Sequence, residues 1–372
     1  MRRMLAITAV WLTSVVCEGE TGLEALEQNI ADQVNAAHGA GEFAGCVVAI
    51  GNSEAILYQQ AFGDRQVVPT TAPMMLDTVF DLASLTKPVA TATSIMRLVE
   101  QGHVRLTDPI SRHLPEITGD HGKAITLRLL LTHYAGYVPD NPLADYQQGP
   151  DEAWRRLFRL RPTKPPGTTF QYSDVNFELL GKVVERVSGE PLDEFARDEL
   201  YAPLGMTRTT FNPGPELTGI AAATEPRDGQ MLVGEVHDPR AALLGGVAGH
   251  AGLFSTAGDL AKYAMVLLRN DGSLLSPATV AEMTRPLGVE PNLRTQGWDH
   301  ASRYSSNRGD LLSDRAFGHG GFTGTAMWID PELGLFVIFL SNRLHPDGSG
   351  SVNDLAGRIA NIAAAATSKP AP

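Results

Sequence analysis

The sequence predicts an α+β fold, in which an antiparallel sheet flanked by helices is interrupted by an inserted helical region. Two observations carry this prediction. Strand patterns occur near both ends of the chain, each beside a helical pattern, and the middle consists of short helical segments separated by Pro/Gly-rich loops. Helices that pack on a sheet bury the apolar faces of both. We expect an active site where the sheet part meets the helical part.

The N-terminal part predicts a helix and then a strand hairpin. Apolar residues recur at three- and four-residue spacing, which is typical of an amphipathic helix; they are Leu23, Leu26, Ile30 and Val34. Residues 45–50 and 55–62 have strand composition, and a turn around Gly51-Asn52 separates them. Two strands so close in sequence favour an antiparallel pair.

Helical periodicity returns at Ser84 and continues to about Gly102, a residue type that often ends helices. Pro88 lies in the first turn of this segment, where its missing N–H does little harm. Residues 100–245 alternate between short helical patterns and Pro/Gly loops. The loops within 137–160 and 289–304 are expected to form the walls of a pocket.

The C-terminal part repeats the N-terminal arrangement. A helix is predicted over residues 257–268, a strand pair over 325–329 and 335–341, and a closing helix from 352 to about 365. We therefore expect one domain over residues 23–366, with its α/β part in 23–85 and 250–366 and its helical part in 86–249. Residues 367–372 are expected to be a flexible tail.

Composition excludes several classes of function. A chain of 372 residues with 43% apolar and 19% charged residues can bury a core of ordinary size. Its 42 acidic and 30 basic residues give a net charge of −12, which repels a phosphate backbone, so no nucleic-acid partner is expected. Cys17 and Cys46 are the only cysteines, too few for a disulfide framework or a thiolate zinc site.

The N-terminus resembles an export signal. Met1-Arg2-Arg3 precedes an apolar run that ends at Cys17 and is too short to span a membrane comfortably. We expect residues 1–20 to be a signal peptide, the protein to be secreted or periplasmic, and association with the cell envelope to be possible. Lipid attachment at Cys17 stays open, although Val16 fits it poorly, and so does a frayed tail without a signal.

The first chemical motif is Ser84-Leu85-Thr86-Lys87. Residues i and i+3 of a helix share a face, so the lysine amine can approach the serine hydroxyl. Such a hydroxyl needs a neighbour that takes its proton, and a lysine can do this only if its pKa falls. The alternative is a helix-capping serine followed by a solvated lysine.

Two further motifs follow in the chain. Tyr172 opens Tyr172-Ser173-Asp174, and its phenol could relay a proton, although a core tyrosine is the plainer interpretation. His319-Gly320-Gly321-Phe322 precedes the C-terminal strand pair. Glycines there would let a substrate lie along an edge strand, or simply form a bend.

The sequence lacks the motifs of other hydrolase classes. The chain has no Gly-x-Ser-x-Gly elbow and no His-Glu-x-x-His zinc motif. His237 and His250 flank a glycine-rich segment without ligand spacing, so we expect loop histidines and no metal site.

The order of the three motifs resembles the signature of the penicillin-recognising serine enzymes. Within them, the chain is most similar to the class C β-lactamase group, which includes D-Ala-D-Ala carboxypeptidases, D-aminopeptidases and β-lactamase-like esterases. The similarity extends over about residues 23–365, and further matching stretches are 80–87, 125–133, 170–181, 203–206 and 251–256.

This resemblance implies a β-lactamase/transpeptidase-like fold and a set of roles. Ser84 would attack a carbonyl, and Lys87 and Tyr172 would shuttle protons. The backbone N–H groups of Ser84 and Phe322 would form an oxyanion hole beside Gly321. His319 would lie near the substrate carboxylate or the tyrosine. No cofactor is implied.

The chain departs from the family pattern at two positions. Asp174 replaces the usual amide, and an ionised carboxylate accepts hydrogen bonds without donating any, so it could hold Lys87 charged. His319 stands where typical β-lactamases have lysine, and a neutral imidazole attracts a penicillin carboxylate less strongly. Efficient β-lactamase action is therefore not expected.

We expect a serine hydrolase that forms an acyl-enzyme and acts on D-amino-acid peptides, amides or related acyl substrates. Its partner is then a small-molecule or peptide substrate, such as a cell-wall peptide, a β-lactam or an ester. A carboxylesterase with the same residues is the alternative, and an inactive binding protein on the same fold is a third.

Overall fold

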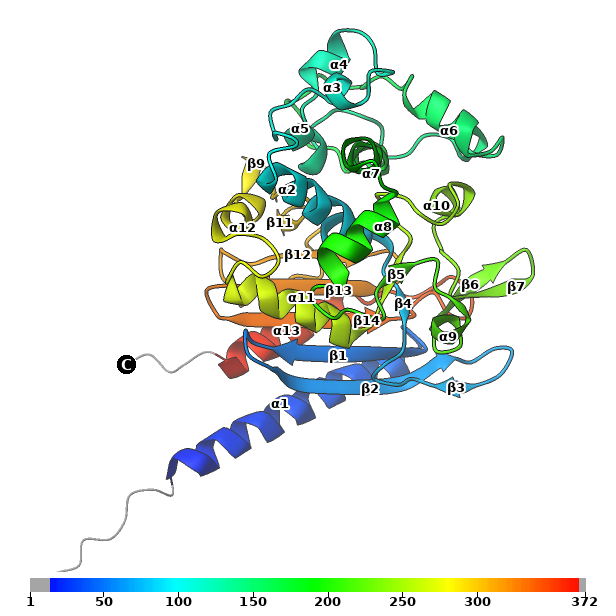
Figure 1. The fold of residues 1–372 in the computed structure, drawn as a ribbon. Helices are drawn as coiled ribbons and strands as arrows, with labels where there is room; N and C mark the ends of the chain where they lie inside the picture. The colour runs from blue at the N-terminus through cyan, green and yellow to red at the C-terminus, as the bar shows by residue number, and fades with distance from the viewer. Residues whose placement is uncertain (1–13, 368–372) are drawn as a thin grey trace, which may run out of the picture.

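The structure is a computed structural model that describes residues 14–367 (Figure 1). Its centre is a nine-stranded antiparallel sheet with the strand order β3-β2-β1-β14-β13-β12-β11-β10-β9. The strands are β1 (Gly45–Gly51), β2 (Ile56–Gln66), β3 (Ala72–Pro73), β9 (Leu287–Val289), β10 (Asn292–Arg294), β11 (Asp299–Ala301), β12 (Phe317–Gly321), β13 (Thr325–Asp330) and β14 (Leu335–Ser341). The first and last strands of the described chain, β1 and β14, thus lie side by side in one sheet.

Helices cover both faces of the sheet, and α1 and α13 lie together on one of them (Figure 1). The helices are α1 (Ser14–Gly39), α2 (Thr93–Glu100), α3 (Ile110–His113), α4 (Asp120–Ala124), α5 (Leu127–Leu131), α6 (Pro150–Leu157), α7 (Asp174–Ser188), α8 (Leu192–Ala196), α9 (Pro215–Thr218), α10 (Pro239–Leu243), α11 (Ala257–Arg269), α12 (Pro277–Met283) and α13 (Asn353–Thr367). The opposite face carries α11, and beyond it stand the helices of the middle of the chain, with α7 among them.

The central strands are buried on both faces, which explains their continuous apolar sequences. Successive side chains of a strand point to opposite faces. In β1, Val47 and Ala49 face the core that contains α11 and the middle helices, whereas Val48 and Ile50 face the core under α1 and α13.

Short elements connect the sheet to the helical part. Two small sheets have the orders β4-β8-β5 and β6-β7. Their strands are β4 (Phe80–Asp81), β8 (Leu253–Ser255), β5 (Thr210–Phe211), β6 (Ala223–Arg227) and β7 (Gln230–Val233). The described residues also form the 3₁₀ helices η1 (Ala83–Leu85) and η3 (Leu143–Asp145) and the π-helices η2 (Lys87–Ala92) and η4 (Arg197–Tyr201).

The predicted fold class is confirmed, and so are the strand pairs at both ends of the chain. The first pair is β1–β2, whose turn is closed by the N–H of Asn52 and the carbonyl of Ala55 at 3.0 Å. The second pair is β13–β14. The interpretation of residues 319–322 as a bend was wrong in part, because residues 319–321 belong to β12 and pair with β13. The expected wall loop 289–304 contains β10 and β11.

The predicted signal peptide and Cys17 lie outside the residues whose side chains are described, and the predicted tail lies almost wholly beyond the described range. Export and lipid attachment therefore stay predictions. Within residues 14–367, no helix combines the length and the apolar character needed to cross a membrane.

Candidate active site

The first motif begins at a strained turn between β4 and η1. Ala83, beside Ser84, has a φ of 45°, a left-handed conformation that residues other than glycine rarely adopt. The carboxylate of Asp81 holds the turn, since its Oδ1 accepts the N–H of Ala83 at 2.8 Å and its Oδ2 accepts that of His237 at 2.6 Å. Backbone strain that is held in this way is frequent at functional sites.

Lys87 is fully buried, so the alternative of a solvated lysine does not hold. Its Nζ donates to Ser84 Oγ at 2.8 Å and to the carbonyl of His250 at 3.0 Å. It also lies 2.7 Å from Asp174 Oδ1, at an angle outside the hydrogen-bonding range. The three contacts surround the amine with acceptors.

A lysine that accepts a proton must be neutral, but the surroundings of Lys87 favour its charged form. Burial lowers its pKa, but the carboxylate of Asp174 and the phenol of Tyr172 outweigh burial, and the net shift of the pKa is upward. Lys87 is therefore an ammonium at neutral pH. The motif requires a lysine with a lowered pKa, and Lys87 does not have one in this state, mainly because of the Asp174 carboxylate.

Tyr172 lies beside this pair. Its half-buried ring stacks on His133 with centroids 4.4 Å apart, and Lys87 Nζ is 5.0 Å from its centroid. Burial raises the pKa of Tyr172, and the nearby Lys87 offsets this only in part, so the phenol is protonated. Ser173 caps α7 by accepting the N–H of Asn176, which places Asp174 in the first turn of that helix.

His133 belongs to the matching stretch 125–133, but its sequence position gives it no role. Its Nδ1 accepts the N–H of Ser173 at 3.1 Å. Burial, followed by the charges of Arg294 and Lys87, holds its pKa well below the usual range, so the imidazole is neutral. Its hydrogen bond to Ser173 holds the Tyr172-Ser173-Asp174 segment in place.

His319 on β12 is likewise neutral. Its pKa is lowered well below the usual range by burial and by the charges of Arg294 and Lys87. Nδ1 lies 2.7 Å from the carbonyl of Gly320, which can only accept, so Nδ1 carries the proton. Nε2 is then an acceptor, and among residues 14–367 it is buried without a partner.

The turn between β12 and β13 is hydrogen-bonded to the residues that precede Ser84. Thr323 Oγ1 donates to the carbonyl of Asp81 at 2.7 Å, and Thr325 Oγ1 donates to that of Leu82 at 3.0 Å. Gly321 packs against the second of these bonds: a Cβ there would be 2.1 Å from Thr325 Oγ1 and 2.3 Å from the Leu82 carbonyl oxygen, so no larger residue fits. These bonds fix the spacing between Ser84 and Phe322.

The three motifs meet at one cavity of about 370 Å³. Ser84, Tyr172, His319, Gly321 and Phe322 all line it, whereas Lys87 and Asp174 do not appear in its lining. Phe322 stands at the rim with 61% of its surface exposed.

Arg294 of β10 also lines the cavity, and sequence reasoning missed it. The residue is fully buried, and Nε, Nη1 and Nη2 all lack a hydrogen-bond partner in the described part of the chain. Asp299 is a counter-ion of Arg294, with Nη1 3.2 Å from Oδ1. The only signal in the sequence was that its segment was expected to form a pocket wall.

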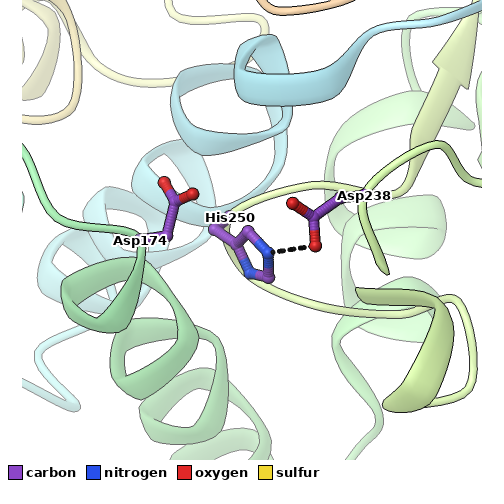
Figure 2. Close-up of side chains that lie close together, drawn as sticks. All are labelled: Asp174, Asp238 and His250. Carbon is purple, nitrogen blue, oxygen red and sulfur yellow. Dashed lines mark hydrogen bonds and ion pairs between the residues drawn. The ribbon is translucent and has the colours of Figure 1, made fainter. Parts of the chain in front are cut away.

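A second layer of charges lies behind Lys87. Figure 2 shows Asp174, His250 and Asp238, whose ligand-type atoms lie within 4.8 Å of one another. His250 Nε2 is 3.0 Å from Asp238 Oδ1. These residue types can bind divalent cations, but Lys87 and His250 already supply positive charge here, and we assign no metal to the cluster. His237, the other expected loop histidine, pairs with Glu225 at 2.8 Å.

Comparison with known proteins places these features in a family. Residues 24–362 match the family model described as Beta-lactamase. The chain is 33% identical over 344 residues to the N-acetylmuramyl-L-alanine amidase of Bacillus subtilis (strain 168), over 82% of this chain and 78% of that protein. It is 34% identical over 338 residues to a protein of Escherichia coli (strain K12) that is provisionally named D-alanyl-D-alanine carboxypeptidase, over 78% and 76% of the two chains.

Solved structures agree on the fold. EstCE1, a hydrolase with promiscuous acyltransferase activity, superposes with a TM-score of 0.74 at 23% identity, over 93% of this chain and 99% of that chain. A class C beta-lactamase superposes with a TM-score of 0.76 at 14% identity, over 92% and 98%. The chain therefore belongs to the beta-lactamase family, whose members are serine hydrolases.

Proposed function

We propose that this protein is a serine hydrolase that forms an acyl-enzyme on Ser84 and acts on peptide amides of the D-amino-acid type. The observation that carries the proposal is the 2.8 Å contact between Lys87 Nζ and Ser84 Oγ, where Ser84 lines the cavity. A hydroxyl paired with a buried amine is the arrangement that an activated nucleophile requires.

The charge at rest determines the first step. Lys87 carries a proton, so acylation proceeds from the minor state in which Lys87 has released it, to Asp174 or to solvent. Ser84 Oγ then bonds to the substrate carbonyl carbon while its proton passes to Lys87 Nζ. When the tetrahedral intermediate collapses, the C–N bond breaks, and the proton on Lys87 passes through the Tyr172 hydroxyl to the leaving amine.

The carbonyl oxygen needs donors in the intermediate. The backbone N–H groups of Ser84 and Phe322 are the proposed oxyanion hole, and the bonds from Thr323 and Thr325 support it by fixing their separation. In deacylation, water bonds to the acyl carbon and gives its proton to the now neutral Lys87. The bond between that carbon and Ser84 Oγ then breaks, and Ser84 Oγ takes the proton from Lys87.

The cavity favours an anionic substrate. Its lining includes Arg294 and Arg343 against one carboxylate, that of Asp299. Arg294 presents donors without partners, and a guanidinium fork matches a carboxylate. A peptide with a free carboxylate meets this requirement. The two named relatives, an amidase and a carboxypeptidase, support amide cleavage.

A carboxylesterase is the second candidate. Tyr304 and Phe322 line the cavity and are 43% and 61% exposed, so the rim offers apolar surface to an acyl chain. A neutral ester would not use Arg294, which is why we rank this candidate below the peptidase.

Mass spectrometry of the intact protein tests both candidates. Wild type, Ser84→Ala and Ser94→Ala are each exposed to a penicillin, a D-Ala-D-Ala peptide, N-acetylmuramyl-L-alanine and a short-chain nitrophenyl ester. Ser94 is a suitable control because it is a buried serine of the neighbouring α2. We expect an acyl adduct on Ser84 in wild type and in Ser94→Ala but none in Ser84→Ala, and faster turnover of the peptides than of the ester.

Adduct formation in Ser84→Ala would contradict the acyl-enzyme proposal. Turnover of the ester alone, with no amide cleaved, would select the carboxylesterase. A protein that reacts with no substrate and with no fluorophosphonate would be an inactive binding protein.

A further inference from the structure

A cluster of charged side chains adjoins Lys87, and the mechanism above uses only its nearest member, Asp174. Figure 2 shows its centre, the His250 side chain between Asp174 and Asp238. His250 is 1% exposed, so its charge is scarcely screened by water. Glu178 lies on the other side of the imidazole, with its Oε1 3.7 Å from Nδ1.

His250 contacts Lys87 through its backbone and Asp238 through its side chain. Its carbonyl accepts from Lys87 Nζ at 3.0 Å, and its Nε2 lies 3.0 Å from Asp238 Oδ1. Asp238 is itself fixed, because it caps α10 by accepting the N–H groups of Arg240 and Ala241. The segment is also held by Thr91, whose Oγ1 donates to the carbonyl of Gly249 at 2.7 Å.

The balance of charge around Lys87 depends on the imidazole. The ionisable groups that face His250 from the surrounding elements are Lys87, Asp140, Tyr146, Asp174, Glu178, Asp238 and Arg240. Arg240 donates to the Asn141 carbonyl and pairs with Asp140. Without a charged His250, Lys87 would be the main cation that faces Asp174 and Asp238, and these carboxylates would bind its proton more firmly.

We propose that His250 is a positioning residue for the acyl transfer: its imidazolium, held by Asp238, offsets the carboxylates behind Lys87 and so lets Lys87 release its proton. Its carbonyl at the same time keeps the amine beside Ser84. The inference rests on the serine-hydrolase function proposed above, and His250 itself forms no bond to substrate.

The protonation of His250 agrees with this arrangement. Burial lowers the pKa of the imidazole, but Asp238 and then Glu178 and Asp174 outweigh burial and raise the pKa to about 9. His250 is therefore charged throughout the neutral range and loses its charge only in alkaline solution.

The coupling of the two groups predicts a distinctive pH dependence. The reactive state, with neutral Lys87 and charged His250, holds as many protons as the unreactive state with charged Lys87 and neutral His250. The rate of serine acylation therefore rises with pH only until the pair loses its first proton, near pH 9, and then levels off.

The test is the second-order rate of Ser84 labelling by a fluorophosphonate between pH 6 and pH 11. In this reaction Ser84 Oγ forms the O–P bond, the P–F bond breaks with loss of fluoride, and the serine proton passes to Lys87. In His250→Gln, Lys87 is the only member of the pair that titrates, and its pKa is higher than that of Lys87 beside a charged His250. We expect labelling at pH 7 to fall roughly ten- to a hundredfold and to keep rising beyond pH 9, so that the defect shrinks.

Asp238→Asn is the second variant. Asparagine can still cap α10 and accept from His250, but it removes the charge that raises the pKa of His250. We expect the level-off to move to lower pH than in wild type.

His113→Gln is the matched control, because His113 pairs with Asp108 at 3.1 Å, both nearly buried, far from Ser84 in the chain on α3. We expect it to keep the wild-type profile. Circular dichroism confirms the fold of each variant.

A purely structural role would lower labelling of His250→Gln by one factor at every pH and leave the level-off near pH 9, which would overturn the inference. If His250→Gln does not fold, an unmoved level-off in Asp238→Asn overturns it instead. Ser84→Ala separates the two proposals. If this variant is labelled like wild type, the proposed function fails. If it is not labelled, and His250→Gln keeps the wild-type pH profile, only the inference about His250 is refuted.

Discussion

Asp174 places a negative charge where the resemblance to the penicillin-recognising serine enzymes implies a neutral amide. It lies 2.7 Å from Lys87 Nζ and raises the pKa of the amine that is proposed to activate Ser84. The sequence identified both the departure and its consequence, because the residue type alone determines the sign of the interaction.

Asp174→Asn tests this interaction. Asparagine removes the negative charge, so the pKa of Lys87 falls and the rise of labelling with pH shifts to lower pH, by roughly one to three units. The fluorophosphonate rate at pH 7 then exceeds that of wild type. Asp145→Asn is the control, since Asp145 is equally exposed (20%) and also paired, with Arg156. Loss of labelling at every pH would instead identify Asp174 as an indispensable proton acceptor.

At the scale of residues, the sequence predicted the contact that depends on local spacing, but not the site residues that the fold brings in from elsewhere in the chain. Ser84 and Lys87 share one turn, so their 2.8 Å contact follows from three positions of separation. Arg294 and His250 reach the same place from distant segments. Their importance depends on burial and on missing or distant partners, which no local pattern records.

At the scale of elements, two segments determine where Lys87 lies: the π-helix η2, which it begins, and the glycine-rich segment before β8. The sequence predicted a helix over Ser84–Gly102 but not the 3₁₀ and π turns at its start. Over so few residues, apolar spacing does not distinguish bonds to the third, fourth or fifth residue. The glycine-rich segment looked like an ordinary loop, although it approaches α7 very closely.

Gly249→Ala tests this close approach. A Cβ at Gly249 would lie 1.9 Å from the carbonyl of Phe177, so α7 and the segment must move apart. We expect a loss of about 1–3 kcal/mol in the free energy of unfolding and slower Ser84 labelling, because the carbonyl of His250 leaves Lys87. Gly258→Ala is the control: Gly258 lies in α11, a Cβ added there would meet only Thr256 Oγ1 at 3.9 Å, and alanine favours a helix. Equal urea midpoints for the two variants would contradict the packing argument.

At the scale of the whole molecule, the pairing of the chain ends joins the motifs. Strand β1 pairs with β14 along its length, Cys46 opposite Ser341, so the C-terminal motif is brought onto the sheet beside the N-terminal one. Continuous apolar runs predicted the strands at both ends of the chain. Strands β9 to β12 were not predicted, because they are short or rich in glycine and are defined by their partners rather than by propensity.

The stability of the molecule as a function of pH depends on a charge buried in its helical part. Glu178 of α7 accepts from Tyr146 at 2.7 Å, and burial raises its pKa from 4.5 to about 7. A raised pKa means that the folded state binds the proton more tightly than the unfolded chain. Its contribution to stability is therefore fully present below pH 4.5 and is lost as the pH rises through about 7.

Glu178→Gln removes this dependence, because glutamine can still accept from Tyr146 and never ionises. Between pH 4 and pH 8, the free energy of unfolding of the variant should gain about 3 kcal/mol relative to wild type, as measured by urea unfolding. Glu185→Gln, on the same helix but paired with Lys182 at the surface, should change by less than about 1 kcal/mol. If wild type and Glu178→Gln keep a constant difference across this range, burial does not raise the pKa of Glu178, and the carboxyl group ionises in the fold at the same pH as in the unfolded chain.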